Sequence, residues 1–341
     1  MARTSFVGSV LAGIVALSST ATTVHAFVPT SVTFFGDSLT DTGNGDLILS
    51  GLGLPDLTPS PPYASGVASD GSVWAQYLAT SLGRAGDAAP SLPPFSSRNF
   101  AVGTARTGQS GVSGFPIGML SQLSAYGSSS LTTDPTGLYA LYGGANDIFD
   151  AASLATDGAR EDAMTTAMDN LATISEGLYD LGARHFLVPN AFDVGRSPAG
   201  SASNPALLGA LSSRFNELLA DTLVDLAATL PGSTFYGLAL DVLQDNVAYD
   251  ALQGASRYGL TNTSHPCLAL GAPGCDVSTF ADDRHPTAAF HALIAEAAFA
   301  RVVQGVDVSP VPEPVPAVLF ALGIGLLGAF TGRHARGLPI G

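Results

Sequence analysis

The chain contains no lysine: its 13 basic residues are all arginines, set against 28 acidic residues, and the formal net charge is −15. Without lysine, Schiff-base chemistry and the phosphate-binding lysine of Walker-type nucleotide sites are excluded. The acidic balance argues against a nucleic-acid partner, because such proteins present basic side chains to the phosphates. An acidic surface is instead typical of a protein that stays soluble outside the cell.

Cysteine is also scarce. The two cysteines, Cys267 and Cys275, flank a short loop that contains glycine and proline. In an exported protein, two cysteines this close together favour a local disulfide. Free thiols are the alternative. A metal site would require more soft ligands near these two cysteines. We therefore expect no metal at the cysteines, and the sequence implies no metal or organic cofactor elsewhere.

The first 26 residues have the features of a signal peptide. They begin with Arg3, continue through an apolar run and finish at Val24-His25-Ala26. Small residues at the third and first positions before a cut suit signal peptidase, so residues 1–26 are predicted to be removed after Ala26. An uncleaved membrane anchor is the alternative interpretation.

The last residues form a second candidate targeting segment. Pro312-Glu313-Pro314 precedes an apolar run of about 16 residues, Val315–Phe330, and two arginines follow it. The run is slightly shorter than the ~20 residues of a full membrane span, and the arginines would hold its end on the cytoplasmic side. Residues 313–341 resemble the PEP-CTERM sorting signal. That resemblance implies transient membrane insertion and removal by an exosortase; a permanent C-terminal anchor is the alternative.

These end segments leave residues 27–304 as one predicted domain, joined to the tail by a linker at 305–312. The two segments predict an exported protein that reaches the cell surface or the extracellular matrix after C-terminal processing. With 46% hydrophobic residues in the chain, a domain of this size can bury one large core.

Within this domain, near-continuous apolar runs alternate with helical periodicity, which predicts strands covered on both faces by helices. We expect strands at residues 32–36, 99–103, 137–143, 185–190 and 233–240. Asn204-Pro205 is a cap followed by proline at the first helical position, and the last helix is expected to begin at Pro286. The expected fold class is α/β, a three-layer α/β/α sandwich with a central parallel sheet.

A candidate nucleophile follows the first predicted strand, in Gly36-Asp37-Ser38-Leu39. Open α/β sheets bind ligands at the carboxyl ends of their strands, where Ser38 is expected to lie. A serine needs a base, and four histidines lie between the two end segments: His185, His265, His285 and His291. The first lies in a strand-like run, the second in the cysteine loop, and the last on the final helix away from its start.

His285 remains the best base, because Asp282 precedes it by three residues at the mouth of the last helix. A carboxylate at this spacing on a turn can reach Nδ1, which fixes the tautomer and leaves Nε2 free to accept a proton from serine. Asp283 competes for the same role. A metal site formed by Asp282, Asp283 and His285 is a further alternative, but no additional ligands are evident.

Two more segments offer donors to a developing oxyanion. Tyr142-Gly143-Gly144-Ala145-Asn146 closes a predicted strand and supplies the amide of Asn146. Gly103 ends another predicted strand, where a backbone N–H can face the substrate. Taken singly, each glycine is better explained as part of a turn.

Together, Gly36-Asp37-Ser38, Gly103, Gly144–Asp147 and Asp282-x-x-His285 resemble the blocks of the GDSL or SGNH hydrolase family. The resemblance implies the flavodoxin-like sandwich of that family. It implies that Ser38 is the nucleophile, His285 its base and Asp282 the partner of His285. It also implies that the backbone N–H groups of Ser38 and Gly103 and the amide of Asn146 form the oxyanion hole.

The resemblance runs from about Ser31 to Val303. Four segments look like the branch of bacterial extracellular lipases, lecithinase-type hemolysins and plant esterases: Phe35–Asn44, Pro61–Tyr63, Asp70–Trp74 and Phe215–Leu218. Two positions depart from it. Thr104 stands where many members have a second glycine, and Ala281 where an aromatic residue is frequent.

The sequence thus predicts a secreted serine esterase or lipase that hydrolyses carboxylic esters through an acyl-enzyme. Its substrate would be a small-molecule, lipid or glycan ester. One alternative is an exopolysaccharide-associated acetylesterase. Another is a non-catalytic surface or matrix binding protein on the same fold, which the PEP-CTERM resemblance suggests.

Overall fold

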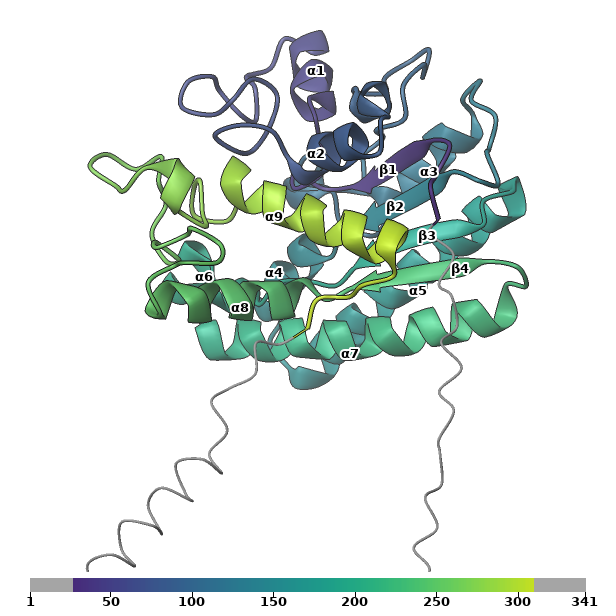
Figure 1. Cartoon of the computed structure of the whole chain (residues 1–341). Helices are drawn as coiled ribbons and strands as arrows, with labels where there is room; N and C mark the ends of the chain where they lie inside the picture. The colour runs from purple at the N-terminus through teal and green to yellow at the C-terminus, as the bar shows by residue number, and fades with distance from the viewer. Residues whose placement is uncertain (1–26, 310–341) are drawn as a thin grey trace, which may run out of the picture.

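A computed structural model describes residues 27–309 of the chain (Figure 1). The predicted signal peptide, 1–26, and the predicted sorting signal, 313–341, lie outside the described residues. The centre of the fold is a four-stranded parallel sheet in the order β1-β2-β3-β4. Its strands are β1 (Val32–Gly36), β2 (Leu138–Tyr142), β3 (His185–Pro189) and β4 (Thr234–Leu238).

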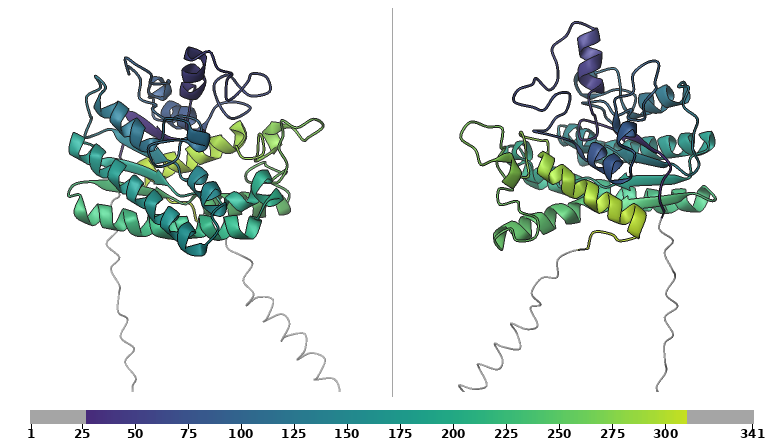
Figure 2. Two further views of the ribbon diagram at one scale, coloured as in Figure 1. Left: turned by 180° about the vertical axis from the view of Figure 1, so that it is seen from behind. Right: turned by 45° about the horizontal axis from the view of Figure 1, so that its top comes forward.

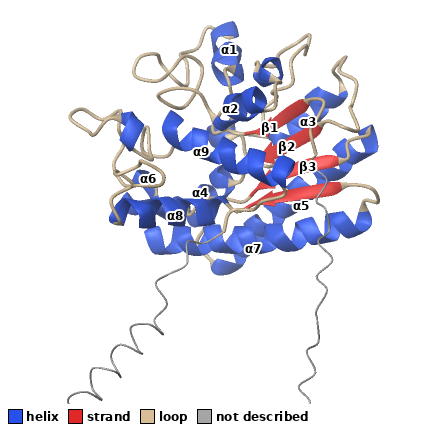
Figure 3. Ribbon diagram, in the orientation of Figure 1, coloured by secondary structure: helices blue, strands red, loops and turns tan. Residues whose placement is uncertain are grey.

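Helices cover both faces of the sheet, which lies between them in Figure 3. One face packs against α2 (Trp74–Ser81), α8 (Leu240–Leu252) and α9 (Ala288–Phe299). The other face packs against α3 (Met119–Gly127), α4 (Ala145–Ala152), α5 (Asp157–Leu181) and α7 (Pro205–Thr229), and this layer faces the viewer when the molecule is seen from behind (Figure 2). Each face has its own apolar cluster, so the predicted three-layer α/β/α sandwich is confirmed.

The remaining helices are short and lie in the connections. They are α1 (Asn44–Gly51), α6 (Pro198–Ala202), the 3₁₀ turns Ala85–Ala88, Val112–Gly114, Val194–Arg196 and Cys275–Val277, and a π-helical turn at Ala300–Gln304. Within residues 27–309, no helix combines the length and the apolar character needed to cross a membrane.

One predicted strand, 99–103, is wrong as a regular strand. The segment does run beside β1, on the side away from β2, where Phe100 N donates to Phe34 O at 2.8 Å and Val102 N to Gly36 O at 3.1 Å. Its outward carbonyls have other partners, because the Asn44 side chain donates to the carbonyl oxygens of both Asn99 and Ala101 at 2.8 Å. Asn99 O also accepts from Ser91 N at 2.9 Å, so this side of the segment bonds a side chain and a loop rather than a further strand.

This edge segment matters for the topology. From β1 the chain passes to residues 99–102 on one side of β1 and then returns to β2 on the other side. Counting the segment as a strand gives the order 2-1-3-4-5, which is the flavodoxin-like order with its ligand crevice at the reversal point. Residues that follow β1, the edge segment and β2 therefore meet at the carboxyl end of the sheet.

The helix starts follow the expected capping chemistry. The side chain of Asn204 accepts from Leu207 N at 3.2 Å and α7 begins at Pro205, as predicted. The last helix, α9, begins at Ala288 rather than at Pro286, with Thr287 as its cap. Pro286 forms an antiparallel bridge with Phe280 instead, which extends the turn that carries His285.

Candidate active site

The turn after β1 presents Ser38 at the carboxyl end of the sheet. The carboxamide of Gln122 on α3 accepts from Gly36 N at 2.9 Å and donates to Gly36 O at 2.8 Å, which fixes the end of the strand. A Cβ atom at Gly36 would collide with the carbonyl oxygen of Tyr142, so only glycine allows β1 and β2 to approach this closely. Ser38 itself is partly exposed, whereas its neighbour Asp37 is 1% exposed.

Asp37 shapes this turn from within. Its side chain accepts from Leu39 N at 3.0 Å, and its carbonyl accepts from the N–H groups of Thr40 and Asp41. Burial raises the pKa of Asp37 to about 7. Burial thus disfavours the charged form of the carboxyl group beside Ser38.

His285 lies within hydrogen-bonding distance of Ser38 although 247 residues separate them, with Ser38 Oγ and His285 Nε2 at 2.9 Å. Asp282 Oδ2 lies 2.7 Å from His285 Nδ1. The other oxygen, Asp282 Oδ1, accepts from the backbone N–H groups of Arg284 and His285 at 2.8 and 2.7 Å. The same carboxylate thus closes the turn and orients the imidazole.

A residue that sequence reasoning did not assign to the site, Tyr63, donates its hydroxyl to Asp282 Oδ2 at 2.7 Å. Burial opposes ionisation of Asp282, but the hydrogen bonds from His285, Tyr63 and Arg284 outweigh it and hold the pKa of Asp282 below its usual range. The sequence signal was the Pro61-Pro62-Tyr63 motif, which indicated a family branch but no contact with Asp282.

The other three histidines of the domain have different environments. His291 is fully buried without a hydrogen-bond partner on its ring, and burial lowers its pKa to about 3. His265 is exposed beside Ser264, and His185 stacks on Phe27 with ring centroids 3.8 Å apart. Of the four, His285 is the one in contact with Ser38.

Asp283, the competitor of Asp282, is exposed, and its backbone carbonyl accepts from Ala199 N at 2.8 Å. The carboxylate on His285 therefore belongs to Asp282. Among residues 27–309, no group of three histidine, cysteine, aspartate or glutamate side chains is placed to hold a metal ion.

The structure pairs Cys267 with Cys275 in a disulfide. The cysteine loop bonds the segment just before Asp282, because Cys267 N donates to Phe280 O and Leu268 N to Ala281 O, both at 2.9 Å. The loop therefore supports the turn that carries Asp282 and His285.

The predicted oxyanion donors differ in their surroundings. Asn146, in the first turn of α4, uses one amide N–H to donate to Ala105 O at 2.9 Å, which leaves its second N–H available. Gly103 departs from expectation: its N–H donates to Asp41 Oδ2 at 2.7 Å rather than facing the substrate. The Asp41 carboxylate accepts hydrogen bonds from several backbone N–H groups of the surrounding loops, including those of Gly43 and Gly45.

Two cavities meet at Ser38, Asn146 and His285. The first has a volume of about 50 Å³ and mostly apolar walls, including Phe149, Phe192, Phe280 and Phe290. The second is larger, about 190 Å³, and more polar, with Asp41, Asp46, Thr58, Thr104 and Arg284 in its walls. The site can therefore hold a small apolar group on one side of Ser38 and a larger polar group on the other.

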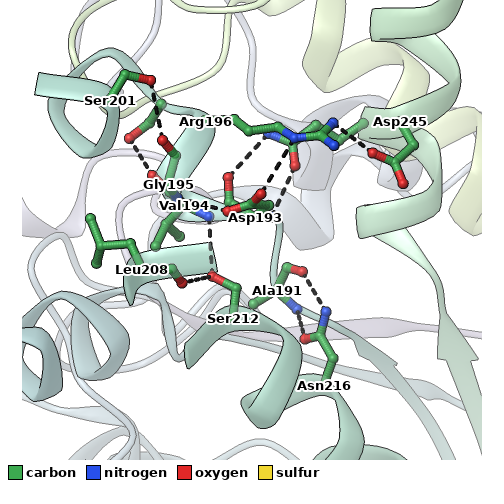
Figure 4. Close-up of polar contacts among 12 residues, drawn as sticks. Ala191, Asp193, Val194, Gly195, Arg196, Ser201, Leu208, Ser212, Asn216 and Asp245 are labelled. Carbon is green, nitrogen blue, oxygen red and sulfur yellow. Dashed lines mark hydrogen bonds and ion pairs between the residues drawn. The ribbon is translucent and has the colours of Figure 1, made fainter. Parts of the chain in front are cut away.

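The loop after β3 forms one wall of the apolar cavity, and its hydrogen bonds are drawn in Figure 4. The Asn216 amide accepts from Ala191 N and donates to Ala191 O, both at 2.9 Å. The next residue, Phe192, packs against Phe290 with ring centroids 5.3 Å apart. Further along, Val194 N donates to the Ser212 hydroxyl, and Arg196 pairs with Asp193 and Asp245 (Figure 4). The wall is thus held rigidly from α7 and α8.

A serine at the end of the first strand, a histidine on its hydroxyl and a carboxylate behind that histidine form the geometry of a hydrolase that acts through a serine. Residues 32–298 match the family model of the GDSL-like Lipase/Acylhydrolase, and the chain belongs to this family. It is accordingly a carboxylic ester hydrolase, as predicted. A search of curated proteins finds no match.

Among solved structures, the chain is similar to Axe2, an acetylxylan esterase from Geobacillus stearothermophilus. The two share 14% sequence identity over 80% of this chain and 93% of that one, with a TM-score of 0.42. A catalytic mutant of the same enzyme matches at 12% identity over the same shares, with a TM-score of 0.41.

Proposed function

We propose that the protein is an exported esterase in which Ser38 is the nucleophile, His285 the general base and acid, and Asp282 the group that orients His285. The observation that carries this proposal is the continuous chain of contacts from Ser38 Oγ to His285 Nε2, 2.9 Å, and from His285 Nδ1 to Asp282 Oδ2, 2.7 Å.

In the first half-reaction Ser38 Oγ forms a bond to the ester carbonyl carbon while its proton passes to His285 Nε2. The electron pair of the carbonyl moves to oxygen, and hydrogen-bond donors around the cavity stabilise that charge. Collapse of the intermediate breaks the bond to the alcohol, which leaves with the proton from His285. Water then repeats these steps on the acyl-enzyme and releases the acid.

The proposed location rests on the two end segments. Signal peptidase would remove residues 1–26, and an exosortase would process the tail at 313–341 after its transient insertion in the membrane. The mature enzyme would then act at the cell surface or in the extracellular matrix. The proposed substrate is a small-molecule, lipid or glycan ester.

A non-catalytic matrix-binding protein on the same fold is less well supported. A binding protein would not need a hydroxyl, an imidazole and a carboxylate joined by hydrogen bonds in this order. Incubation with a fluorophosphonate probe tests the choice. We expect one covalent adduct, located on Ser38 by peptide mass spectrometry and absent from the Ser38→Ala variant. An unlabelled wild-type protein, or equal labelling of the variant, would rule out Ser38 as the nucleophile.

The small apolar cavity favours a narrower second proposal, an esterase for short acyl groups such as the acetyl groups of an exported polysaccharide. A volume of about 50 Å³ has room for only a few water-sized groups. The larger, more polar cavity on the other side of Ser38 would take the polyhydroxylated alcohol.

A panel of p-nitrophenyl esters from acetate to octanoate, together with an acetylated glycan, tests this narrower proposal. We expect kcat/KM to fall by at least about 10²-fold from acetate to octanoate, because each methylene that the cavity cannot accommodate costs ~10-fold or more. Phe192→Ala should raise the octanoate rate relative to acetate, because it removes one wall of the cavity, whereas Leu252→Ala, on the exposed end of α8, should leave the ratio unchanged. A wild-type preference for octanoate would contradict a short-acyl pocket.

A further inference from the structure

The N–H groups around the Ser38 cavity can be sorted by whether they already have an acceptor. The N–H of Gly103 donates to Asp41. Within residues 27–309, the backbone N–H groups of Ser38 and Thr104 have no hydrogen-bond acceptor, and Thr104 lines the same cavity as Ser38 and Asn146. We infer that the backbone N–H of Thr104, and not that of Gly103, completes the oxyanion hole.

The backbone of Thr104 supports this assignment. Its φ is 71°, in the left-handed region, where a β-branched residue is a genuine outlier. Such conformations persist only where the surroundings enforce them, and they cluster at functional sites. Three other described residues that are not glycine have positive φ, but none is β-branched and none lines either cavity at Ser38: Phe95, Ser113 and Ala255.

The contacts on both sides of Thr104 enforce this conformation. Before it, Gly103 N is held by Asp41; after it, Ala105 O accepts from the Asn146 amide at 2.9 Å. Thr104 O itself accepts from Val112 N at 2.9 Å. The bond from Asn146 ties the two remaining donors together, because it fixes the Asn146 amide against the residue that follows Thr104.

The side chain of Thr104 does not explain its conformation. Its hydroxyl is buried without a partner and lies against Gly111, where a Cβ atom would approach Thr104 Oγ1 to 2.6 Å. An unpaired buried hydroxyl is unfavourable in a folded protein. The strained backbone is therefore retained for the direction of the N–H rather than for a contact of the hydroxyl.

This inference rests on the proposed serine mechanism and is tested by removing one N–H at a time. An α-hydroxy acid with the threonine side chain, incorporated at position 104, converts the amide into an ester without the N–H. We expect kcat for p-nitrophenyl acetate to fall by about 10²–10³-fold with little change in KM, as for loss of one oxyanion donor. Affinity for a boronic acid that mimics the tetrahedral intermediate should fall in parallel.

Glycolic acid at position 103 is the matched control, because it removes the N–H that donates to Asp41. We expect this ester to lower the melting temperature and to change kcat by less than the ester at 104.

Unchanged kcat with the ester at 104, or a larger loss of kcat with the ester at 103, would overturn the inference. Fluorophosphonate labelling distinguishes a wrong assignment of Thr104 from a wrong proposed function. Labelling of Ser38 in the wild-type protein would support the serine mechanism even if the ester at position 104 had no effect on kcat.

Discussion

Ser38→Ala and His285→Ala should each lower kcat/KM for p-nitrophenyl butyrate by roughly 10⁴-fold or more, because each removes a group that acts on the reacting atoms. The contact of 2.9 Å between Ser38 Oγ and His285 Nε2 makes the two residues one functional unit. The double variant should therefore lose no more activity than either single variant. Steady-state kinetics on the three purified variants measures this directly.

His265→Ala is the matched control, because this exposed histidine contacts Ser264 rather than the serine of the site. It should keep wild-type kinetics. Retention of most activity by Ser38→Ala or His285→Ala, or additive losses in the double variant, would contradict a shared mechanism for the two residues.

Asp282→Asn is expected to lower kcat by about 10⁴-fold, since an amide in this place favours the wrong tautomer of the histidine. The carboxylate accepts from His285 Nδ1 and from Tyr63 through Oδ2, and from two backbone N–H groups through Oδ1. Asparagine keeps Oδ1 for the turn but places an N–H₂ group opposite Nδ1. Stopped assays with p-nitrophenyl acetate, with the melting temperature measured in parallel, distinguish this effect from unfolding.

Asp283→Asn is the control for the neighbouring position, because Asp283 is exposed and Asp282 is the residue on His285. Its kcat should stay within about threefold of the wild type, as is usual for a surface substitution away from the chemistry. If Asp283→Asn lost activity and Asp282→Asn kept it, the two carboxylates would have to exchange the roles assigned to them.

Much of the fold follows from local pattern. Strands that are buried on both faces appear in the sequence as apolar runs, and four of the five strands predicted from such runs are present. The start of α7 follows from the cap at Asn204 and the proline after it. The segment at 99–103 is not a regular strand: it forms only isolated bridges, and on the side away from β1 its carbonyls accept from the Asn44 side chain. Such a contact between distant residues leaves no trace in local periodicity.

The sequence by itself determined the α/β class, the family, and the residue types around Ser38, because strand periodicity and the spacing of Asp282 and His285 are local properties. Only the tertiary structure decided which groups meet. In the folded chain Tyr63 donates a hydrogen bond to Asp282, 219 positions away, and the N–H of Gly103 donates to Asp41. The fold also sets Thr104 at a φ of 71°. These outcomes depend on how separate loops pack at one edge of the sheet, and no local pattern encodes that packing.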